Sequence, residues 1–267
     1  MSIARIKGFA DMFPPDSDQF TRIENTARGV FGRYGFVELR TPLLEFTELF
    51  CRSIGEETDV VQKEMYTFPD RKGRSLTLRP EATAGVMRAY IESGLTNREP
   101  VSRLFTTGPM FRYERPQKGR YRQFKQVGVE SFGFAGPDID AEQILMGARL
   151  WDDLGLDGIK LQLNSLGQLE ERAKYRAELV TYFEKYATLL DEDAKRRLYT
   201  NPLRILDSKN PTMQEMIAGA PKLMAHLGAE SMAHFEGVQQ VLRDVGLPYE
   251  INPRLVRGLD YYNLTVF

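Results

Sequence analysis

The sequence predicts an α+β fold in which helices flank an antiparallel sheet and a helical domain is inserted late in the chain. Two strand-like stretches, "SRLFTTGPMFRYE" and "YRQFKQVGVESFGF", are joined by a polar turn. Helical periodicity precedes and follows them. From about Gln168 to Gly246 only helical patterns occur, and strand character then returns. We therefore expect three parts: a main α/β part over 1–167, a helical insertion over 168–246, and a return to the main part over 247–267.

The first elements are predicted from their boundary residues. After a double proline, Asp16 or Ser17 can cap a helix that ends at Gly35. "FVELRTP" is typical of a strand that stops at Pro42, because proline cannot donate a ladder hydrogen bond. "MYTFPDRKGRSLTLRP" predicts a hairpin with a Pro/Gly turn, and a helix follows over about 81–93.

In the second half of the chain the sequence predicts more helix and fewer strands. "DIDAEQILMGARLWDDLGL" predicts an acid-capped helix and "GIKLQLNS" a strand. In the insertion, "EERAKYRAELVTYFEKYATLL" and "SMAHFEGVQQVLRDVG" are the clearest helices. "PYEIN" and "RLVRGLDYYNLTVF" predict strands, the second of which reaches Phe267 without a terminating turn.

Composition limits the class of protein. The chain has 267 residues, of which 42% are hydrophobic, so it can bury a sizeable core. A net charge of -1 means that nucleic acid or polyphosphate must be met by a local patch. Cys51 is the one cysteine in the sequence, which excludes an internal disulfide and a cysteine zinc cluster. With no signal-like start and no long apolar segment, we expect a cytoplasmic protein with no membrane partner.

Several chemistries lack their residues. His226 and His234 are the only histidines of the sequence and fall in the predicted insertion, so the main part has no histidine base for a Ser/His/Asp or Cys/His site. Neither GxxxxGK[ST] nor GxGxxG occurs. Phosphate must therefore be bound by side chains, for which the planar, permanently charged arginine is well suited.

The run from Arg112 to Lys125 holds six basic residues and one acidic residue. It is either a solvated hairpin tip or a ligand site. Strand alternation places Phe124, Gln126 and Glu130 on one face and Lys125 on the other. A face of charged, polar and aromatic side chains is unfavourable unless a ligand or another layer satisfies it, which favours the ligand site.

Two further stretches have two interpretations each. "TLRPEATAG" places Glu81 and Thr83 at a strand-to-helix junction. These residues either form a plain helix cap or belong to a site. "RLVRGLDYY" gathers Arg257, Tyr261 and Tyr262 beside a glycine that lets backbone approach a ligand, as a strand end or as a site.

Together these stretches resemble histidyl-tRNA synthetase, a class II aminoacyl-tRNA synthetase. "FVELRTP" is similar to motif 1, "GPMFRYERPQKGRYRQFKQVGVESFG" to motif 2, "RLVRGLDYY" to the histidine-specific peptide, and "YTNPLRILDSKNP" to part of the insertion. Departures are Ala82 and Lys125, where the family often has glycine and histidine. The resemblance implies that motif 3 and an anticodon-binding domain lie beyond Phe267. We therefore expect a fragment that folds and dimerises but does not charge tRNA.

The resemblance also implies a reaction and a site. L-Histidine and ATP, with Mg²⁺, would form histidyl-adenylate, and a homodimer would transfer histidine to tRNA(His); no metal ligand of the protein is implied. Arg112 and Arg257 would be catalytic. The residues implied to bind ATP are Arg112, Glu114, Arg120, Phe124 and Arg257. Those implied to surround histidine are Glu81, Thr83, Gln126, Glu130, Tyr261 and Tyr262.

Two other functions remain open. The regulatory subunit of ATP phosphoribosyltransferase shares the class II fold and would bind ligand without catalysis. The intact "RYERPQKGRYRQF" and "RLVRGLDYY" favour the ligase. A general RNA-binding module would explain the basic run but not the acidic Glu81 and Glu130.

Overall fold

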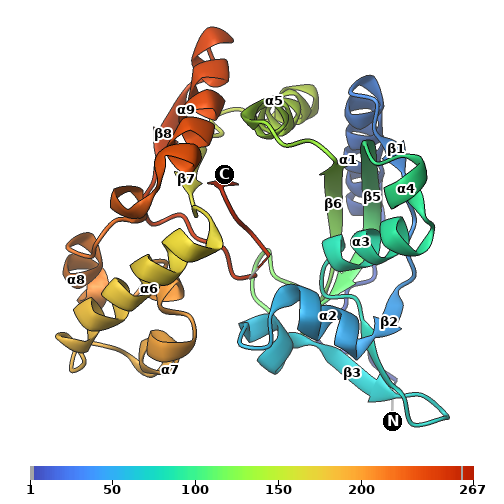
Figure 1. Ribbon diagram of the computed structural model, residues 1–267. Helices are drawn as coiled ribbons and strands as arrows, with labels where there is room; N and C mark the ends of the chain where they lie inside the picture. Colours follow the sequence, from blue (N-terminus) through green and yellow to red (C-terminus); the bar gives the residue numbers. More distant parts are fainter. Residues whose placement is uncertain (1–2, 260) are drawn as a thin grey trace. The chain divides into compact units, whose positions relative to one another are not determined.

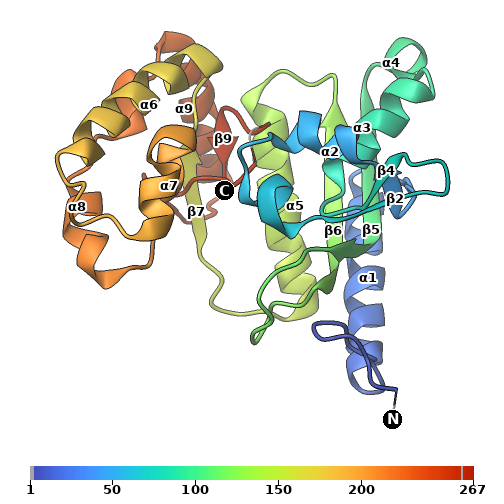
Figure 2. The same cartoon turned by 90° about the horizontal axis from the view of Figure 1, so that it is seen from below.

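The computed structural model describes residues 3–259 and 261–267 (Figures 1 and 2). The chain folds as two compact units. The first unit comprises Met1–Ala135 and Met146–Asp157, and the second comprises Gly136–Leu145 and Gly158–Phe267. The division into 1–167, 168–246 and 247–267 stays a prediction.

The first unit is built on a sheet of order β1 (Val37–Glu38), β5 (Ser102–Phe111) and β6 (Gln123–Phe132). β1 runs parallel to β5, and β5 and β6 form a long antiparallel hairpin. Within that hairpin Met110 lies opposite Phe124, and Leu104 opposite Glu130. Residues opposite one another share a face, so the predicted alternation along β6 is confirmed.

Helices cover both faces of this hairpin (Figures 1 and 2). On one face, Phe105 and Val129 pack with α1 (Asp16–Arg33). On the other, Leu104 and Phe132 pack with α3 (Thr83–Glu92). The predicted capping of α1 is wrong: Pro15 holds the N-cap position with helical backbone angles, and Asp16 lies in the first turn, where acidic groups suit the helix dipole.

A second antiparallel sheet of the first unit has the order β2 (Leu44–Phe46), β4 (Ser75–Leu78) and β3 (Tyr66–Pro69). The predicted hairpin is its β3–β4 pair. β2 was not expected, because the sequence prediction stopped at the proline before it. The remaining elements here are α2 (Thr47–Ile54), the π-helical turn η1 (Val60–Glu64) and α4 (Leu95–Arg98).

In the second unit, β7 (Leu161–Ser165) lies between β8 (Tyr249–Ile251), to which it is parallel, and β9 (Thr265–Val266), to which it is antiparallel. The first part of helix α5 (Pro137–Leu154) belongs to this unit and its second part to the first unit, and only helices and turns occur between β7 and β8. They are α6 (Leu169–Glu184), α7 (Glu192–Thr200), η2 (Pro202–Ile205), η3 (Pro211–Met213), α8 (Gln214–Ala218), η4 (Leu223–His226) and α9 (Ala229–Asp244).

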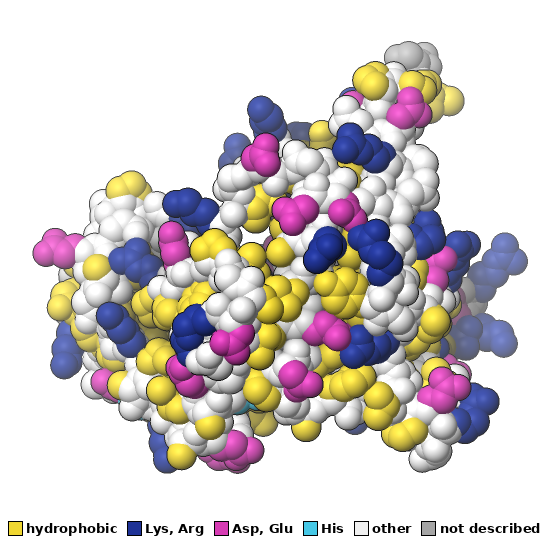
Figure 3. Space-filling model, turned by 90° about the horizontal axis from the view of Figure 1, so that it is seen from above, with side chains coloured by type: hydrophobic (Ala, Val, Ile, Leu, Met, Phe, Trp, Pro, Cys, Tyr) yellow, Lys and Arg dark blue, Asp and Glu magenta, His cyan; other side chains and the backbone are white. Residues whose placement is uncertain are grey.

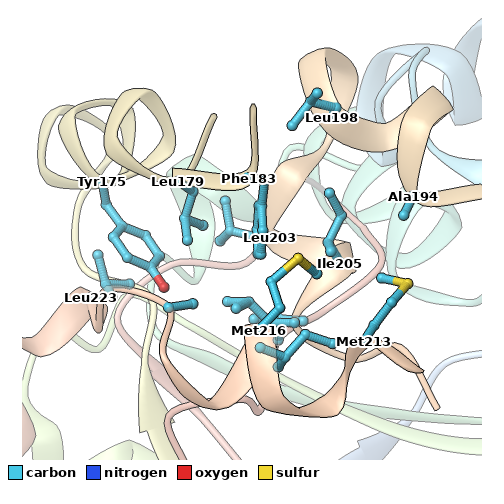
Figure 4. Close-up of a cluster of buried hydrophobic side chains, with 14 of the residues drawn as sticks. Tyr175, Leu179, Phe183, Ala194, Leu198, Leu203, Ile205, Met213, Met216 and Leu223 are labelled. Atoms are coloured by element: carbon cyan, nitrogen blue, oxygen red, sulfur yellow. The ribbon is translucent and has the colours of Figure 1, made fainter. Parts of the chain in front are cut away.

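A buried apolar cluster holds these helices together (Figure 4). Tyr175, Leu179 and Phe183 project from α6 toward side chains of the following helices. The Tyr175 hydroxyl donates to the carbonyl oxygen of Pro221 at 2.8 Å, so this large buried side chain leaves no polar atom unsatisfied.

The strand predicted over "RLVRGLDYYNLTVF" is largely wrong, since among the described residues of this stretch, 254–259 and 261–267, only Thr265–Val266 forms a strand. The buried Asn164 of β7 donates to the carbonyl oxygens of Leu255 at 3.0 Å and Pro253 at 3.4 Å. The Asn164 side chain thus bonds to carbonyl oxygens that a neighbouring strand would otherwise use. Val256, in the same stretch, packs into the helical core.

Over the described ranges, 3–259 and 261–267, the helices are too short or too polar to cross a membrane.

Candidate functional site

Glu81 closes the N-terminus of α3. Its side chain is 3% exposed, and the carboxylate accepts hydrogen bonds from the backbone N–H groups of Thr83 at 2.6 Å and Ala84 at 2.9 Å. A carboxylate here satisfies two free helix donors and faces the positive end of the helix dipole. The helix-cap interpretation is therefore correct, and it fixes a charged group at the edge of the β5–β6 face.

Thr83 joins Glu81 to Glu130 on β6. The Thr83 hydroxyl donates to Glu130 Oε1 at 2.7 Å, while its backbone N–H donates to Glu81. Burial raises the pKa of Glu130 to about 7; the hydrogen bond from Thr83 opposes the shift and the nearby charge of Glu81 adds to it. Two carboxylates bridged by a threonine form an acidic cluster suited to a cationic or donor-rich ligand.

The same strand face extends from the acidic cluster to an arginine. Phe124 and Gln126 precede Glu130 along β6 at alternate positions. The guanidinium of Arg112 lies 5.3 Å from the centre of the Phe124 ring, and its Nε donates to the carbonyl oxygen of Pro80 at 2.8 Å. One end of the face is therefore acidic and the other aromatic and basic.

Arg112 was predicted inside a strand, but β5 ends one residue earlier, at Phe111. Its backbone N–H still donates to the carbonyl oxygen of Arg122 at 2.9 Å, which extends the hairpin ladder. The residues between them form the loop 112–122, in which Gln117 and Arg120 make a single bridge. Arg112 is thus held at its backbone by the hairpin and at its side chain by Pro80.

Glu114 lies close to two arginines of the loop. Its carboxylate lies 3.1 Å from Arg120 Nη1 and 3.9 Å from Arg112 Nη1. Glu64, at the end of η1, was not predicted to belong here. Burial, and then repulsion from the charge of Glu114, raise the pKa of Glu64. Sequence gave no signal for Glu64, because it lies far from the loop along the chain.

Lys125 belongs to the opposite face, as alternation predicted. Its ammonium lies 2.5 Å from Glu24 Oε1 of α1 and 5.3 Å from the centre of the Phe20 ring. The basic run is therefore partly neutralised by its surroundings. Figure 3 shows the same mixture over the face that it draws, with Lys and Arg beside Asp and Glu.

A buried arginine supports the site and was missed by the sequence analysis. Arg79, 4% exposed, donates to Thr41 O at 3.0 Å, Thr41 Oγ1 at 2.9 Å and Pro109 O at 3.0 Å. Burial lowers its pKa. Its hydrogen bonds tie the end of β4, next to Glu81, to β5. The sequence feature that could have indicated a role for Arg79 is the "LRPE" stretch, in which this arginine lies two residues before the capping glutamate.

The other predicted residues lie in the second unit. Tyr261 and Tyr262 place their ring centres 4.7 Å apart, and Arg172 Nη1 donates to the carbonyl oxygen of Tyr262 at 2.5 Å. Arg257 lies 5.5 Å from the Tyr262 ring centre and donates to the carbonyl oxygen of Phe267. Its buried Nε has no hydrogen-bond partner within the described part of the chain. Asp260, in the same stretch, lies outside the described residues.

The structure thus gathers the predicted first-unit residues at one face of β6, the adjoining loop and the N-terminus of α3: Glu81, Thr83, Arg112, Glu114, Arg120, Phe124, Gln126 and Glu130. Arg257, Tyr261 and Tyr262 form a separate group in the second unit.

Known proteins resemble this chain over its whole length. A family model described as histidyl-tRNA synthetase matches residues 8–267. The histidine–tRNA ligase of Dechloromonas aromatica (strain RCB) is 66% identical over 267 residues, which are 100% of this chain and 62% of that protein. The ligase of Ralstonia nicotianae (strain ATCC BAA-1114 / GMI1000) is 62% identical over 266 residues, 99% of this chain and 61% of that protein.

Solved structures are also similar to this chain. Apo histidyl-tRNA synthetase of S. aureus matches with a TM-score of 0.75 at 39% identity, covering 99% of this chain and 60% of that chain. A Bacillus halodurans structure, described as an ATP phosphoribosyltransferase regulatory subunit/histidyl-tRNA synthetase, matches with a TM-score of 0.70 at 20% identity, which shows a shared fold alone. The chain therefore has a class II synthetase fold, and it spans less than two thirds of the length of the two ligases named above.

Proposed function

This chain belongs to the histidyl-tRNA synthetase family, and on that premise we propose that it binds L-histidine and ATP and joins them as histidyl-adenylate. The observation that carries the proposal is the face of β6 that has Glu130, hydrogen-bonded to Thr83 of α3, at one end and Phe124 beside Arg112 at the other. An amino acid with two donor groups fits the acidic end, and a nucleotide fits the aromatic and basic end.

Histidine presents an ammonium group and a ring N–H, and both need acceptors. Two carboxylates, Glu81 and Glu130, supply them, and Thr83 keeps the two at a fixed separation. Gln126 adds a neutral amide on the same face. Tyr261 and Tyr262 are further residues that the family resemblance implies for histidine binding, because their hydroxyl groups can donate or accept.

ATP would lie along the loop end of the face. Arg112 would hold the α-phosphate, because its side chain is fixed by Pro80 and its charge persists at all relevant pH values. Glu114 would lie near the adenine and Arg120 on the distal phosphates. Phe124 would stack on the base. Arg257 is the second arginine that the family resemblance implies for the α-phosphate.

The chemistry needs charge stabilisation more than a nucleophilic side chain. The histidine carboxylate oxygen attacks the α-phosphorus, the bond to the bridging oxygen breaks, and pyrophosphate leaves. Negative charge builds up on the α-phosphate oxygens, where Arg112 and Arg257 would act. A ribose hydroxyl of tRNA(His) would then attack the acyl carbon and release AMP.

Mg²⁺ would arrive on the phosphate oxygens of ATP. Within 3–259 and 261–267 no cluster of three or more His, Cys, Asp or Glu side chains could hold a free ion. Glu64 fits an ion brought by phosphate, because it offers a hard oxygen ligand and because burial, followed by repulsion from Glu114, raises its pKa. The ion would neutralise charge on the departing pyrophosphate.

A homodimer is also part of the proposal. The second sheet of the first unit exposes large apolar side chains, with Leu44 40%, Phe46 50% and Phe68 42% exposed, and Leu43 beside them is 42% exposed. An apolar group of this size on β2 and β3 favours association with a second copy through a self-complementary contact. A cytoplasmic location follows from the proposed reaction, which requires tRNA and ATP.

Histidine-dependent exchange of labelled pyrophosphate into ATP tests adenylate formation by the purified chain. We expect exchange that needs L-histidine and Mg²⁺. Histidine binding without any exchange would instead favour the regulatory-subunit function, and no binding of histidine or ATP would overturn both. Charging of tRNA(His), compared with a full-length relative at equal concentration, tests the transfer step separately.

A further inference from the structure

A short N-terminal segment packs against the ATP-binding loop. Residues 3–7 and 11–13 are exposed, whereas Gly8, Phe9 and Ala10 between them are partly buried. The carbonyl oxygen of Gly8 accepts hydrogen bonds from the backbone N–H groups of Arg122 at 2.8 Å and Gln123 at 3.4 Å. We call Gly8–Ala10 the N-terminal strap.

The strap requires a glycine at its first position. Gly8 has a φ of +88°, which side-chain-bearing residues rarely adopt. A Cβ added there would also lie 2.7 Å from Arg122 Cγ and 2.8 Å from Cδ. The Arg122 side chain therefore occupies the space that any other residue at position 8 would fill.

Phe9 anchors the strap on aromatic side chains beneath the loop. Its ring centre lies 6.0 Å from that of Tyr66, in an edge-to-face arrangement, and 6.4 Å from that of Phe111. Tyr66 in turn packs edge-to-face on Tyr113 of the loop at 5.5 Å. Such pairs add stabilisation beyond the area they bury.

Arg122 connects the strap to the residues proposed to bind ATP. Its guanidinium lies 3.7 Å from the centre of the Tyr113 ring, and its Nε donates to the carbonyl oxygen of Glu114 at 3.2 Å. Its own carbonyl oxygen accepts from the backbone N–H of Arg112 at 2.9 Å. One arginine thus fixes the backbone on both sides of the loop.

We propose that Gly8 and Arg122 form a latch that holds the loop 112–122 in the geometry that binds ATP. Arg122 is then a positioning residue, because its contacts are with Gly8, Tyr113 and Glu114, while Arg112 and Arg120 meet the phosphates. The effect on ATP rests on the proposed function; the effect on the loop does not.

Gly8→Ala tests the latch, with Gly73→Ala as a matched control. Gly73 also has a positive φ, +79°, but an added Cβ there meets nothing within 4 Å. We expect Gly8→Ala to speed amide hydrogen exchange of the loop 112–122 and Gln123 at least tenfold, and Gly73→Ala to leave it unchanged. By calorimetry, ATP affinity should fall about tenfold in Gly8→Ala while histidine affinity stays within twofold.

Arg122→Ala provides a second test that does not strain the backbone at position 8. It should speed loop exchange and weaken ATP as Gly8→Ala does. In the Arg122→Ala background, Gly8→Ala should weaken ATP less than threefold further, because the side chain that it strikes is gone; residues in contact couple in this way. This variant also carries the test if Gly8→Ala does not fold.

Unchanged loop exchange in both variants would overturn the latch, as would equal losses of ATP and histidine affinity, which indicate general destabilisation. A wild-type chain that binds no ATP would overturn the proposed function, and loop exchange alone would then decide whether the latch exists.

Discussion

Glu130 is poised between its charged and neutral forms near neutral pH. Burial raises its pKa to about 7, even though Thr83 donates to it at 2.7 Å. A cationic ligand favours the charged form of Glu130. Near pH 7, where Glu130 is partly protonated, binding of an ammonium group would therefore release a proton from it. A ligand of opposite charge thus stabilises the charged form of this buried group.

Glu130→Ala should weaken histidine binding by roughly 2 to 4 kcal/mol, because a charge-assisted acceptor is lost from a partly buried site. Calorimetry with L-histidine measures this. Wild-type affinity should also fall as pH drops below about 7, where Glu130 takes up a proton, and the fall should be smaller in Glu130→Gln. Unchanged affinity in Glu130→Ala would remove Glu130 from the histidine site.

Stability should respond to Glu130 in the opposite sense from a salt-bridged carboxylate. The folded pKa of about 7 exceeds the ordinary value of 4.5. The native state therefore binds more protons, and the stability that Glu130 contributes is lost as pH rises from about 4.5 to 7. Glu130→Gln should stabilise the chain at pH 8, by about 1 to 2 kcal/mol for a partly buried group, and have little effect near pH 4.5. Urea denaturation at both pH values checks this; an equal effect at both would contradict it.

Arg257→Ala tests transition-state stabilisation. Its buried Nε has no hydrogen-bond partner within residues 3–259 and 261–267, which leaves a donor for a developing charge. Histidine-dependent pyrophosphate exchange should slow by about a hundredfold or more with little change in the KM for ATP. If only that KM rose, Arg257 would be a ground-state binder.

At the scale of elements, alternation within one strand was predictable and long-range pairing was not. The spacing of Phe124, Gln126 and Glu130 fixed their common face without knowledge of a neighbour. Arg79 was missed, because a buried arginine is identical in sequence to an exposed one and its partners Thr41 and Pro109 lie 38 and 30 residues away. The strand prediction in the second unit failed for the same reason, because Asn164 bonds to Leu255, which lies 91 residues away along the chain.

Asn164→Ala should destabilise the second unit. The change leaves the carbonyl oxygens of Leu255 and Pro253 without their donor, at a cost of about 1 to 3 kcal/mol. Chemical denaturation measures this, with the exposed Asn97→Ala of α4 as the control. Equal denaturation midpoints for the two variants would show that other contacts hold residues 253–255.

At the scale of the whole molecule, the sequence predicted the class of fold through motifs that sit on the first unit's sheet and the second unit's C-terminal stretch. The net charge of -1 concealed the basic loop, which only local counting detected, and the acidic pair Glu81 and Glu130, which only the family resemblance brought together. β2 was missed although it carries Leu44 and Phe46, because Pro42 ended the preceding strand prediction. The exposed apolar side chains of β2 were therefore visible only in the structure, and they bear on assembly.

Phe46→Asp tests assembly through β2. Phe46 is 50% exposed, and an aspartate in its place would bring a charge into the apolar contact that a second copy would bury. We expect a wild-type dimer and a monomeric Phe46→Asp at micromolar concentration by sedimentation, with unchanged helical circular dichroism. Phe13→Asp is the control, since Phe13 is 74% exposed on the N-terminal segment and its replacement should leave the dimer intact. A dimer that survives Phe46→Asp would place the contact away from β2, and a wild-type monomer would remove the homodimer from the proposed function.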